Sequence, residues 1–204
     1  ILVVVKPANV PVQADNSREP HLLMLLKSYI KERDSKPGNV YLGLVHRLDR
    51  PVSGVMVVAK TSKAAGRLSD QIRNRSFKKT YVAKVHGILR KKKDTLVHYI
   101  EKNEKKNQVK VYDNSEQSGN GQRAELSYEV IHEDFKGKKS EVKIDLKTGR
   151  PHQIRAQFSF IGHPLLGDKK YGVLDKEKNI ALKAVSLSFM HPTTKEQLNF
   201  SIKN

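Results

Sequence analysis

Apolar residues recur along the chain with two periods, one typical of strands and one typical of helices. Runs rich in β-branched residues at 1–5 and 55–59 predict buried strands. Residues 81–86 alternate between an apolar face that carries Tyr81 and a second face that carries Lys84, which indicates a half-buried strand. Further strands are expected at 124–131, 141–146, 184–189 and 198–202.

Three segments have helical spacing instead. Pro20 opens the first, and its expected apolar face consists of Leu22, Leu23, Leu25, Leu26 and Ile30. Ser62 is the expected N-cap of the second, in which Ala65, Leu68 and Ile72 share one face. The third segment is 152–161. Strands and helices together predict a strand-rich α+β chain.

A polar tract at 91–121, rich in Lys, Asn and Gln, separates two groups of predicted strands. It contains two short apolar pieces, at 96–100 and 109–112, and therefore predicts hairpins with mobile loops. Such a tract is equally consistent with an RNA-contacting rim and with a solvated face of the protein.

The net charge changes the picture more than the hydrophobic fraction of 37% does. Lys and Arg number 39 against 21 Asp and Glu, so the formal charge is +18. A charge of this size favours a polyanionic partner, with nucleic acid as the first candidate and an anionic membrane surface as the second. A generally basic protein without such a partner is the plainer alternative.

Several classes of protein are excluded or disfavoured. The chain has no Cys, which excludes a disulfide scaffold and a thiolate metal site. No apolar run approaches the ~18 residues of a membrane span, and no signal peptide is visible. The eight His residues have no metal-ligand spacing, and no glycine-rich phosphate loop is present. We therefore expect no metal, no cofactor and no membrane attachment.

The segment HRLDRPVSG, residues 46–54, is a candidate for chemistry. Pro51 fixes one backbone angle and Gly54 permits a close or strained approach, so the loop can hold Asp49 in a defined orientation. An Asp in a turn beside an arginine is also a common structural cap or ion pair, and the segment alone does not decide between these readings.

A second candidate segment is LKTGRPHQIRAQFSFIGHPLLGDKKYG, residues 146–172. A strand, a turn and a helix start bring Arg150, His152 and Arg155 together, an arrangement that favours phosphate or carboxylate. Because the two arginines are five residues apart, one can point toward RNA phosphate while the other reaches inward to an acid. An ordinary capped helix with solvated arginines is the alternative.

These segments carry a resemblance to a known family. HRLDRPVSG resembles the HRLDxxTSG signature of the RluA-type pseudouridine synthases, and four further blocks agree in order. The blocks are VVVKPANVPVQ, FKKTYVAKVHG, KTGRPHQIRAQFSFIGHPLLGDKKYG and ALKAVSLSFMHP. They span essentially the whole chain. The resemblance implies the pseudouridine synthase catalytic fold, a mixed and mostly antiparallel sheet flanked by helices and loops.

The resemblance also implies an isomerase that converts uridine to pseudouridine in structured RNA, either ribosomal or transfer RNA. Asp49 is then the catalytic carboxylate. Arg155 is expected to pair with Asp49 and keep it ionised, with Arg150 as the weaker candidate for that role. Tyr81 resembles the residue whose ring stacks on the flipped uracil. Without the resemblance, Tyr81 reads as a core aromatic.

Three more residues complete the expected site. Arg47 resembles the residue that fills the space left by the flipped base. His46 and His152 are expected to hydrogen-bond the loop and the RNA backbone, with acid–base catalysis as the alternative role. The chain departs from the family pattern at Val52, Gln157 and Lys183, which bear on substrate choice or packing.

Other functions have weaker support. A catalytically inactive RNA-binding module should lack the acid, yet Asp49, Tyr81 and Arg155 are all present. A glycosidase needs a second carboxylate, and its candidates are Asp145, on the polar face of a strand, and Asp168, in a turn. A nucleobase deaminase needs zinc ligands. We expect 1–204 to be one catalytic domain without a separate N-terminal RNA-binding domain, acting as a cytoplasmic monomer.

Overall fold

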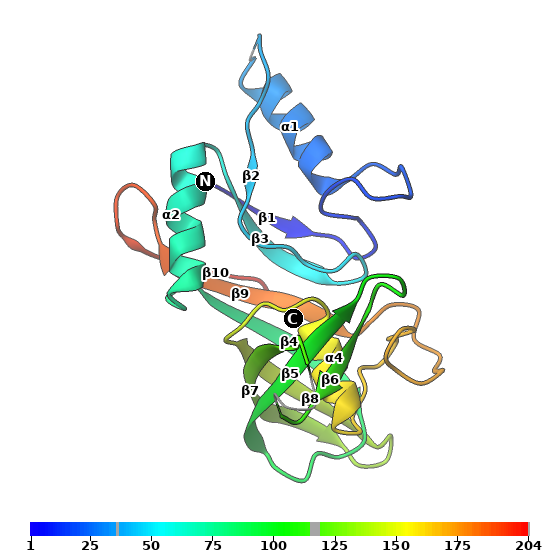
Figure 1. Ribbon diagram of the computed structural model, residues 1–204. Helices are drawn as coiled ribbons and strands as arrows, with labels where there is room; N and C mark the ends of the chain where they lie inside the picture. The colour runs from blue at the N-terminus through cyan, green and yellow to red at the C-terminus, as the bar shows by residue number, and fades with distance from the viewer. Residues whose placement is uncertain (36, 115–118, 204) are drawn as a thin grey trace. The chain divides into compact units, whose positions relative to one another are not determined.

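The computed structural model describes residues 1–35, 37–114 and 119–203 (Figure 1). The chain forms two compact units. Unit 1 consists of residues 1–78 and 184–203, and unit 2 consists of residues 79–183.

Unit 1 combines short antiparallel strands with two helices. Its elements are β1 (Leu2–Lys6), α1 (Leu22–Arg33), β2 (Gly43–Leu44), β3 (Ser53–Ala59), α2 (Ser62–Arg73), most of β9 (Leu182–Met190) and β10 (Gln197–Ser201). Strand β3 pairs antiparallel with β1 and β2, and β9 pairs antiparallel with β10. Because β3 is apolar and almost wholly buried, it forms the centre of this unit.

The core of unit 1 lies where α2 packs against β3 (Figure 1). Ala64 and Leu68 of α2 are buried in one cluster with Val57 of β3. The rings of Phe77 and Phe189 stack in the same cluster, with centroids 4.9 Å apart. Ala65 and Ile72, which the sequence placed on one face with Leu68, pack against this cluster as partly buried side chains.

Gly54 occupies a position that no other residue fits. Its φ is +132°, and a Cβ built there would lie 2.2 Å from the carbonyl oxygen of Ala184. We expect Gly54→Ala to lower the free energy of unfolding by about 3 kcal/mol or more, because strain and overlap with backbone add. Urea unfolding measures this. Gly66→Ala in α2 is the control: a Cβ there meets nothing within 4 Å, and alanine should stabilise the helix by about 0.5–1 kcal/mol.

Unit 2 contains an antiparallel sheet and the buried helix α4. Its elements are β4 (Lys78–His86), β5 (Lys93–Asn103), β6 (Gln108–Tyr112), β7 (Gln122–Asp134), β8 (Lys139–Leu146) and α4 (Gln153–Phe160). The strand order is β4-β8-β7-β5-β6, with every pair antiparallel. Helix α4 packs against β5 and β6, and Ile154, Ala156 and Phe158 are all buried.

The predicted α+β class with a mostly antiparallel sheet is confirmed. The predicted helix starts need correction: the side chain of His21 caps α1 by accepting the N–H of Met24, and Thr61 caps α2 by accepting the N–H of Ala64. Leu25, expected on the buried face of α1, is 48% exposed.

Much of the polar tract at 91–121 is regular structure. It holds β5 and β6, which pair as an antiparallel hairpin. The strands are longer than the two short apolar pieces suggested, because polar residues continue the pairing. Residues 115–118 of the tract lie outside the described residues.

Candidate active site

Asp49 lies in a turn of unit 1 that is anchored on both sides. The N–H of Val52 donates to the carbonyl oxygen of Asp49 at 3.0 Å, which closes the turn. The flanking side chains of Leu48 and Val52 are 6% and 3% exposed, while Asp49 itself is half-buried. Two apolar anchors therefore fix the turn. Val52, where the family signature has Thr, serves as one of these anchors.

A buried lysine adds a polar anchor to the same turn. The ammonium of Lys6, at the end of β1, donates to the carbonyl oxygens of Pro7, Val10 and Arg50 at 2.9, 2.8 and 2.9 Å. Burial lowers the pKa of Lys6 to about 8, and the nearby carboxylate of Asp49 opposes that shift. All three ammonium protons are thus used to hold the backbone beside Asp49.

The other polar residues of the HRLDR segment, His46, Arg47 and Arg50, differ in their exposure and contacts. Arg47 is exposed. His46 accepts the N–H of Val57 at Nε2 and packs on Phe77, with ring centroids 5.6 Å apart. The guanidinium of Arg50 donates to the carbonyl oxygen of Asn9 and forms an ion pair with a carboxylate of the 9–19 loop. His46 therefore hydrogen-bonds the backbone of β3, and its expected contact with the RNA backbone stays a prediction.

Tyr81 lies in β4, on the buried face of the sheet of unit 2. It is 6% exposed, and Ala83 and Val85 follow it on the same face. Thr80 lies on the opposite face, because neighbouring residues of a strand point to opposite sides. The predicted alternation of this strand is confirmed.

Arg155 projects from α4 and reaches a buried acid, Asp168. Its Nε and one terminal nitrogen donate to the two carboxylate oxygens of Asp168 at 2.8 and 2.7 Å. Arg155 is 5% and Asp168 is 1% exposed. A bidentate contact uses one edge of the planar guanidinium and fixes the direction of its other edge. The sequence indicates Asp168 only as part of a turn. The structure shows that Asp168 also neutralises the buried charge of Arg155.

The loop that follows α4 completes the setting of Arg155. Asp168 also accepts the N–H groups of Lys170 and Tyr171 at 2.9 and 3.1 Å. Burial alone raises the pKa of Asp168, but Arg155 and these two N–H groups together hold the pKa below its ordinary value. The ring of Tyr171 lies 5.2 Å from the Arg155 guanidinium, and its hydroxyl lies 2.7 Å from Nδ1 of His152.

Arg150 has protein partners rather than an open position. Its Nε donates to the carbonyl oxygen of Arg123 at 3.0 Å, and a terminal nitrogen donates to the side-chain oxygen of Gln122 at 2.6 Å. Arg155 is directed inward to an acid, which is Asp168, and its expected pairing with Asp49 stays a prediction.

Gln157 stands where the family commonly has His. It is fully buried, and its amide nitrogen lies 2.9 Å from Nδ1 of His98. The same nitrogen donates to the carbonyl oxygens of Leu96 and Ala124. This departure therefore serves packing between α4 and the sheet.

The sequence did not single out the buried charges of Lys6 and Lys79, and it indicated Asp168 only as a carboxylate in a turn. The sequence did contain one signal for Lys79. If the alternation of residues 81–86 is continued toward the N-terminus, Lys79 falls on the apolar face with Tyr81. Lys6 gave no local signal, because its three carbonyl partners come together only on folding. The pairing of Asp168 with Arg155 was missed for the same reason.

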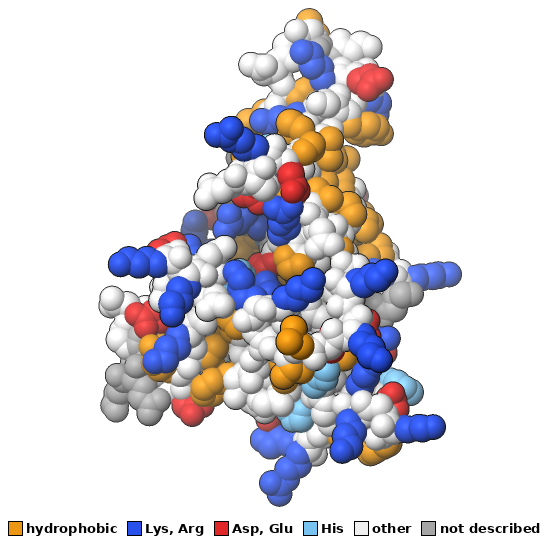
Figure 2. Space-filling view, turned by 90° about the vertical axis from the view of Figure 1, so that its right-hand side faces the viewer, with side chains coloured by type: hydrophobic (Ala, Val, Ile, Leu, Met, Phe, Trp, Pro, Cys, Tyr) orange, Lys and Arg blue, Asp and Glu red, His pale blue; other side chains and the backbone are white. Residues whose placement is uncertain are grey.

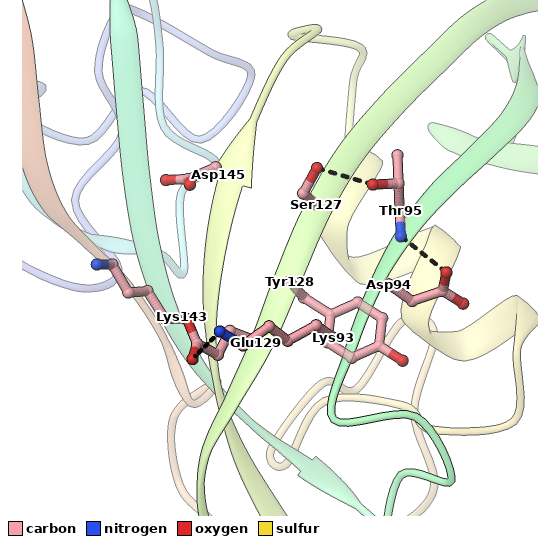
Figure 3. Close-up of a pocket in the computed structure, with 8 residues that line it drawn as sticks. All are labelled: Lys93, Asp94, Thr95, Ser127, Tyr128, Glu129, Lys143 and Asp145. Atoms are coloured by element: carbon pink, nitrogen blue, oxygen red, sulfur yellow. Dashed lines mark hydrogen bonds and ion pairs between the residues drawn. The ribbon is translucent and has the colours of Figure 1, made fainter.

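A groove on unit 2 is distinct from these residues (Figure 3). It is lined by Lys93, Asp94, Thr95, Ser127, Tyr128, Glu129, Lys143 and Asp145. Asp145 accepts the hydroxyl of Thr80 at 3.0 Å, so the groove belongs to the face of the sheet that Tyr81 does not share. Lys93 and Glu129 of its lining form an ion pair at 2.8 Å, and Asp94 pairs with Lys91, outside the lining, at 2.9 Å.

Basic side chains are spread widely over the face that Figure 2 shows. Within residues 1–35, 37–114 and 119–203, no cluster of three or more His, Asp or Glu residues has the arrangement of a metal site. No helix in these same ranges is long and apolar enough to cross a membrane.

Comparison with known proteins identifies the family. Residues 1–160 match the RNA pseudouridylate synthase family. The chain is 34% identical over 212 residues to ribosomal large subunit pseudouridine synthase C of Buchnera aphidicola subsp. Schizaphis graminum, covering 98% of this chain and 63% of that protein. It is 33% identical over 197 residues to an uncharacterised RNA pseudouridine synthase of Bacillus subtilis, covering 96% and 63%.

A solved structure agrees in fold. The human RNA pseudouridylate synthase domain containing 1 superposes with a TM-score of 0.77 at 26% identity, covering 99% of this chain and 79% of the human chain. The chain belongs to the RNA pseudouridylate synthase family. It spans about 63% of the length of the two bacterial relatives named above.

Proposed function

We propose that this chain isomerises uridine to pseudouridine in structured RNA. The observation that carries the proposal is the family match over residues 1–160, which contains Asp49, Tyr81 and Arg155. A catalytically inactive RNA-binding module is the less favoured alternative. It would not need a fixed carboxylate, whereas here a buried lysine and two apolar side chains hold the turn of Asp49 in place.

The proposed reaction breaks the bond between N1 of uracil and C1′ of ribose and forms a bond from C5 to C1′. C5 loses its proton to solvent and N1 gains one. The carboxylate of Asp49 acts at the sugar or base, and Arg155 pairs with it and keeps it ionised. Asp49 belongs to unit 1 and Arg155 to unit 2, so their meeting at one centre is part of the proposal. Since Asp168 holds one edge of the guanidinium, the other edge has a fixed direction for this task.

The target uridine leaves its stack to reach the site. Tyr81 stacks on the extruded uracil, and Arg47, which is exposed, fills the vacated space. His46 and His152 support the loop and the RNA backbone, and Arg150 lies at the RNA-binding surface. The reaction needs no cofactor.

Ribosomal RNA is the first proposed substrate and transfer RNA the second. The relative from Buchnera aphidicola is named for the ribosomal large subunit, which favours the first. We further propose that residues 1–204 act as a single catalytic domain, that the protein is a monomer, and that it works in the cytoplasm.

Tritium release tests the proposed function. Total RNA is prepared from cells that lack this protein and were grown with [5-³H]uridine, and it is incubated with the purified chain. Pseudouridine formation expels the C5 tritium into water, whereas glycosidic hydrolysis instead liberates uracil that retains its tritium. Tritiated water without free uracil supports the proposal, and free uracil in place of tritiated water contradicts it.

Binding to RNA should weaken steeply with salt. The net charge is +18, so some of the Lys and Arg side chains should contact RNA phosphates. Each such contact releases condensed counterions. Between 50 and 200 mM KCl, we expect the Kd for a hairpin RNA to rise about a hundredfold, the size that about four phosphate contacts produce. Fluorescence anisotropy measures the Kd. A Kd independent of salt would exclude an electrostatic mode of binding.

A further inference from the structure

The buried face of β4 carries a charge that neither the fold nor the proposed reaction uses. Lys79 is 8% exposed and lies on the same face as Tyr81, two residues away. The face is otherwise apolar, with Ala83 and Val85 continuing it. A buried ammonium costs free energy unless an opposite charge or several acceptors surround it.

The ammonium of Lys79 has no such surroundings in the protein itself. Across residues 1–35, 37–114 and 119–203, it makes no hydrogen bond and no ion pair. The contrast with Lys6 is direct, since Lys6 is also buried but donates to three carbonyl oxygens. Burial lowers the pKa of Lys79, as expected for an ammonium that has lost water without gaining a counter-charge.

The position of the ammonium is defined by the loop that leads to α4. A Cβ built on Gly149 would lie 3.4 Å from Nζ of Lys79, so the ammonium sits against the backbone of this glycine. The loop is rigid beside it, because the hydroxyl of Thr148 donates to the side chain of Gln153 at 2.8 Å. Arg150, the next residue, is occupied by Arg123 and Gln122. Arg150 keeps its own charge, because these acceptors are neutral. Lys79 is the cation that adjoins this loop from the buried face of β4.

We propose that Lys79 binds a backbone phosphate of the RNA next to the uridine that Tyr81 contacts. This inference rests on the proposed function and adds a substrate-binding residue to it. The phosphodiester is the anion that every RNA carries at each nucleotide, whereas uracil and ribose are neutral at pH 7. A desolvated ammonium pairs best with a full negative charge, and such charge-assisted contacts are about twice as strong as neutral ones.

Equilibrium binding tests the assignment without any catalytic step. Fluorescein-labelled dodecauridylate is titrated with the wild-type chain, with Lys79→Met and with Lys84→Met at several KCl concentrations. Lys84 is the matched control, since it is an exposed lysine on the opposite face of the same strand. We expect Lys79→Met to raise the Kd about tenfold or more and to reduce the slope of log Kd against log salt by about 0.7, the value for one phosphate on a single strand. Lys84→Met should change neither by as much.

Two further measurements separate binding from structure. Lys79→Arg should keep the wild-type salt slope, because it keeps the charge. Lys79→Met should unfold at or above the wild-type temperature, because it replaces an unpaired buried charge with an apolar side chain of similar length. Three results would each overturn the proposal. They are an unchanged Kd and salt slope in Lys79→Met, an equal loss of RNA affinity in Lys84→Met, and a lower unfolding temperature in Lys79→Met. A wild-type chain that binds RNA in this way but releases no tritium would instead refute the proposed isomerase activity.

Discussion

Asp49→Asn should bind RNA as tightly as the wild-type chain and release no tritium from [5-³H]uridine-labelled RNA. Asparagine has nearly the same shape but cannot ionise, so it supplies neither a nucleophile nor a base. We expect the rate to fall by at least about a thousandfold. The fold should survive, because the turn is closed through the backbone carbonyl of residue 49 and through the side chains of Leu48 and Val52.

Asp145→Asn is the matched control for this prediction. Asp145 is a carboxylate of β8 that lines the groove on the other face of the sheet, where it accepts the hydroxyl of Thr80. It was also a candidate second carboxylate for a glycosidase. Full activity in Asp145→Asn with none in Asp49→Asn supports the single-carboxylate account. Near-wild-type turnover in Asp49→Asn would remove Asp49 from the proposed chemistry.

Asp168→Asn should be the most destabilising change among the charged residues. It removes the counter-charge of Arg155, and both side chains are almost fully buried, at 6% and 0% exposure. An uncompensated buried charge costs about 3–5 kcal/mol, which should appear in urea unfolding. Turnover should also fall, since one edge of the guanidinium loses its fixed partner.

A double variant separates the structural part of this effect from the functional part. Arg155→Met with Asp168→Leu replaces the ion pair by apolar side chains, and it should recover most of the lost stability. It should not recover turnover, because no cation is left to pair with Asp49. Recovery of both would show that Arg155 serves packing alone.

The same pair predicts how stability depends on pH. The ordinary pKa of Asp168 is 3.8, and the folded protein holds it lower. The unfolded chain therefore takes up a proton first as the pH falls. The stabilisation from this carboxylate should be present above pH 3.8 and should be lost below it. Asp168→Asn should flatten the acid end of the stability profile, and an unchanged profile would contradict the low pKa.

The sequence predicted elements well where periodicity alone decides them. Strand β4 was expected because its alternation has one buried face, and α2 because its apolar residues share one side. Its cap was misplaced by one residue, since Thr61 and Ser62 both carry a hydroxyl that can accept a backbone N–H. Leu25 was misplaced because helical spacing gives a face but does not say how wide the partner surface is.

The features of the candidate site also differ in how far local sequence determines them. The turn of Asp49 and the position of Tyr81 follow from local sequence, because glycine, proline and strand alternation act over a few residues. The pairing of Arg155 with Asp168 joins residues thirteen apart across a helix and a loop, so it depends on how the chain folds back. The three carbonyl contacts of Lys6 depend on the meeting of separate loops.

The measurement that tests the central claim most directly is a pseudouridine map of cellular RNA. Total RNA is compared from cells that carry the wild-type gene, the Asp49→Asn gene and no copy of the gene. The account predicts that one or more pseudouridines are present with the wild-type gene and are absent from the same positions in the other two. Identical maps from all three would contradict it.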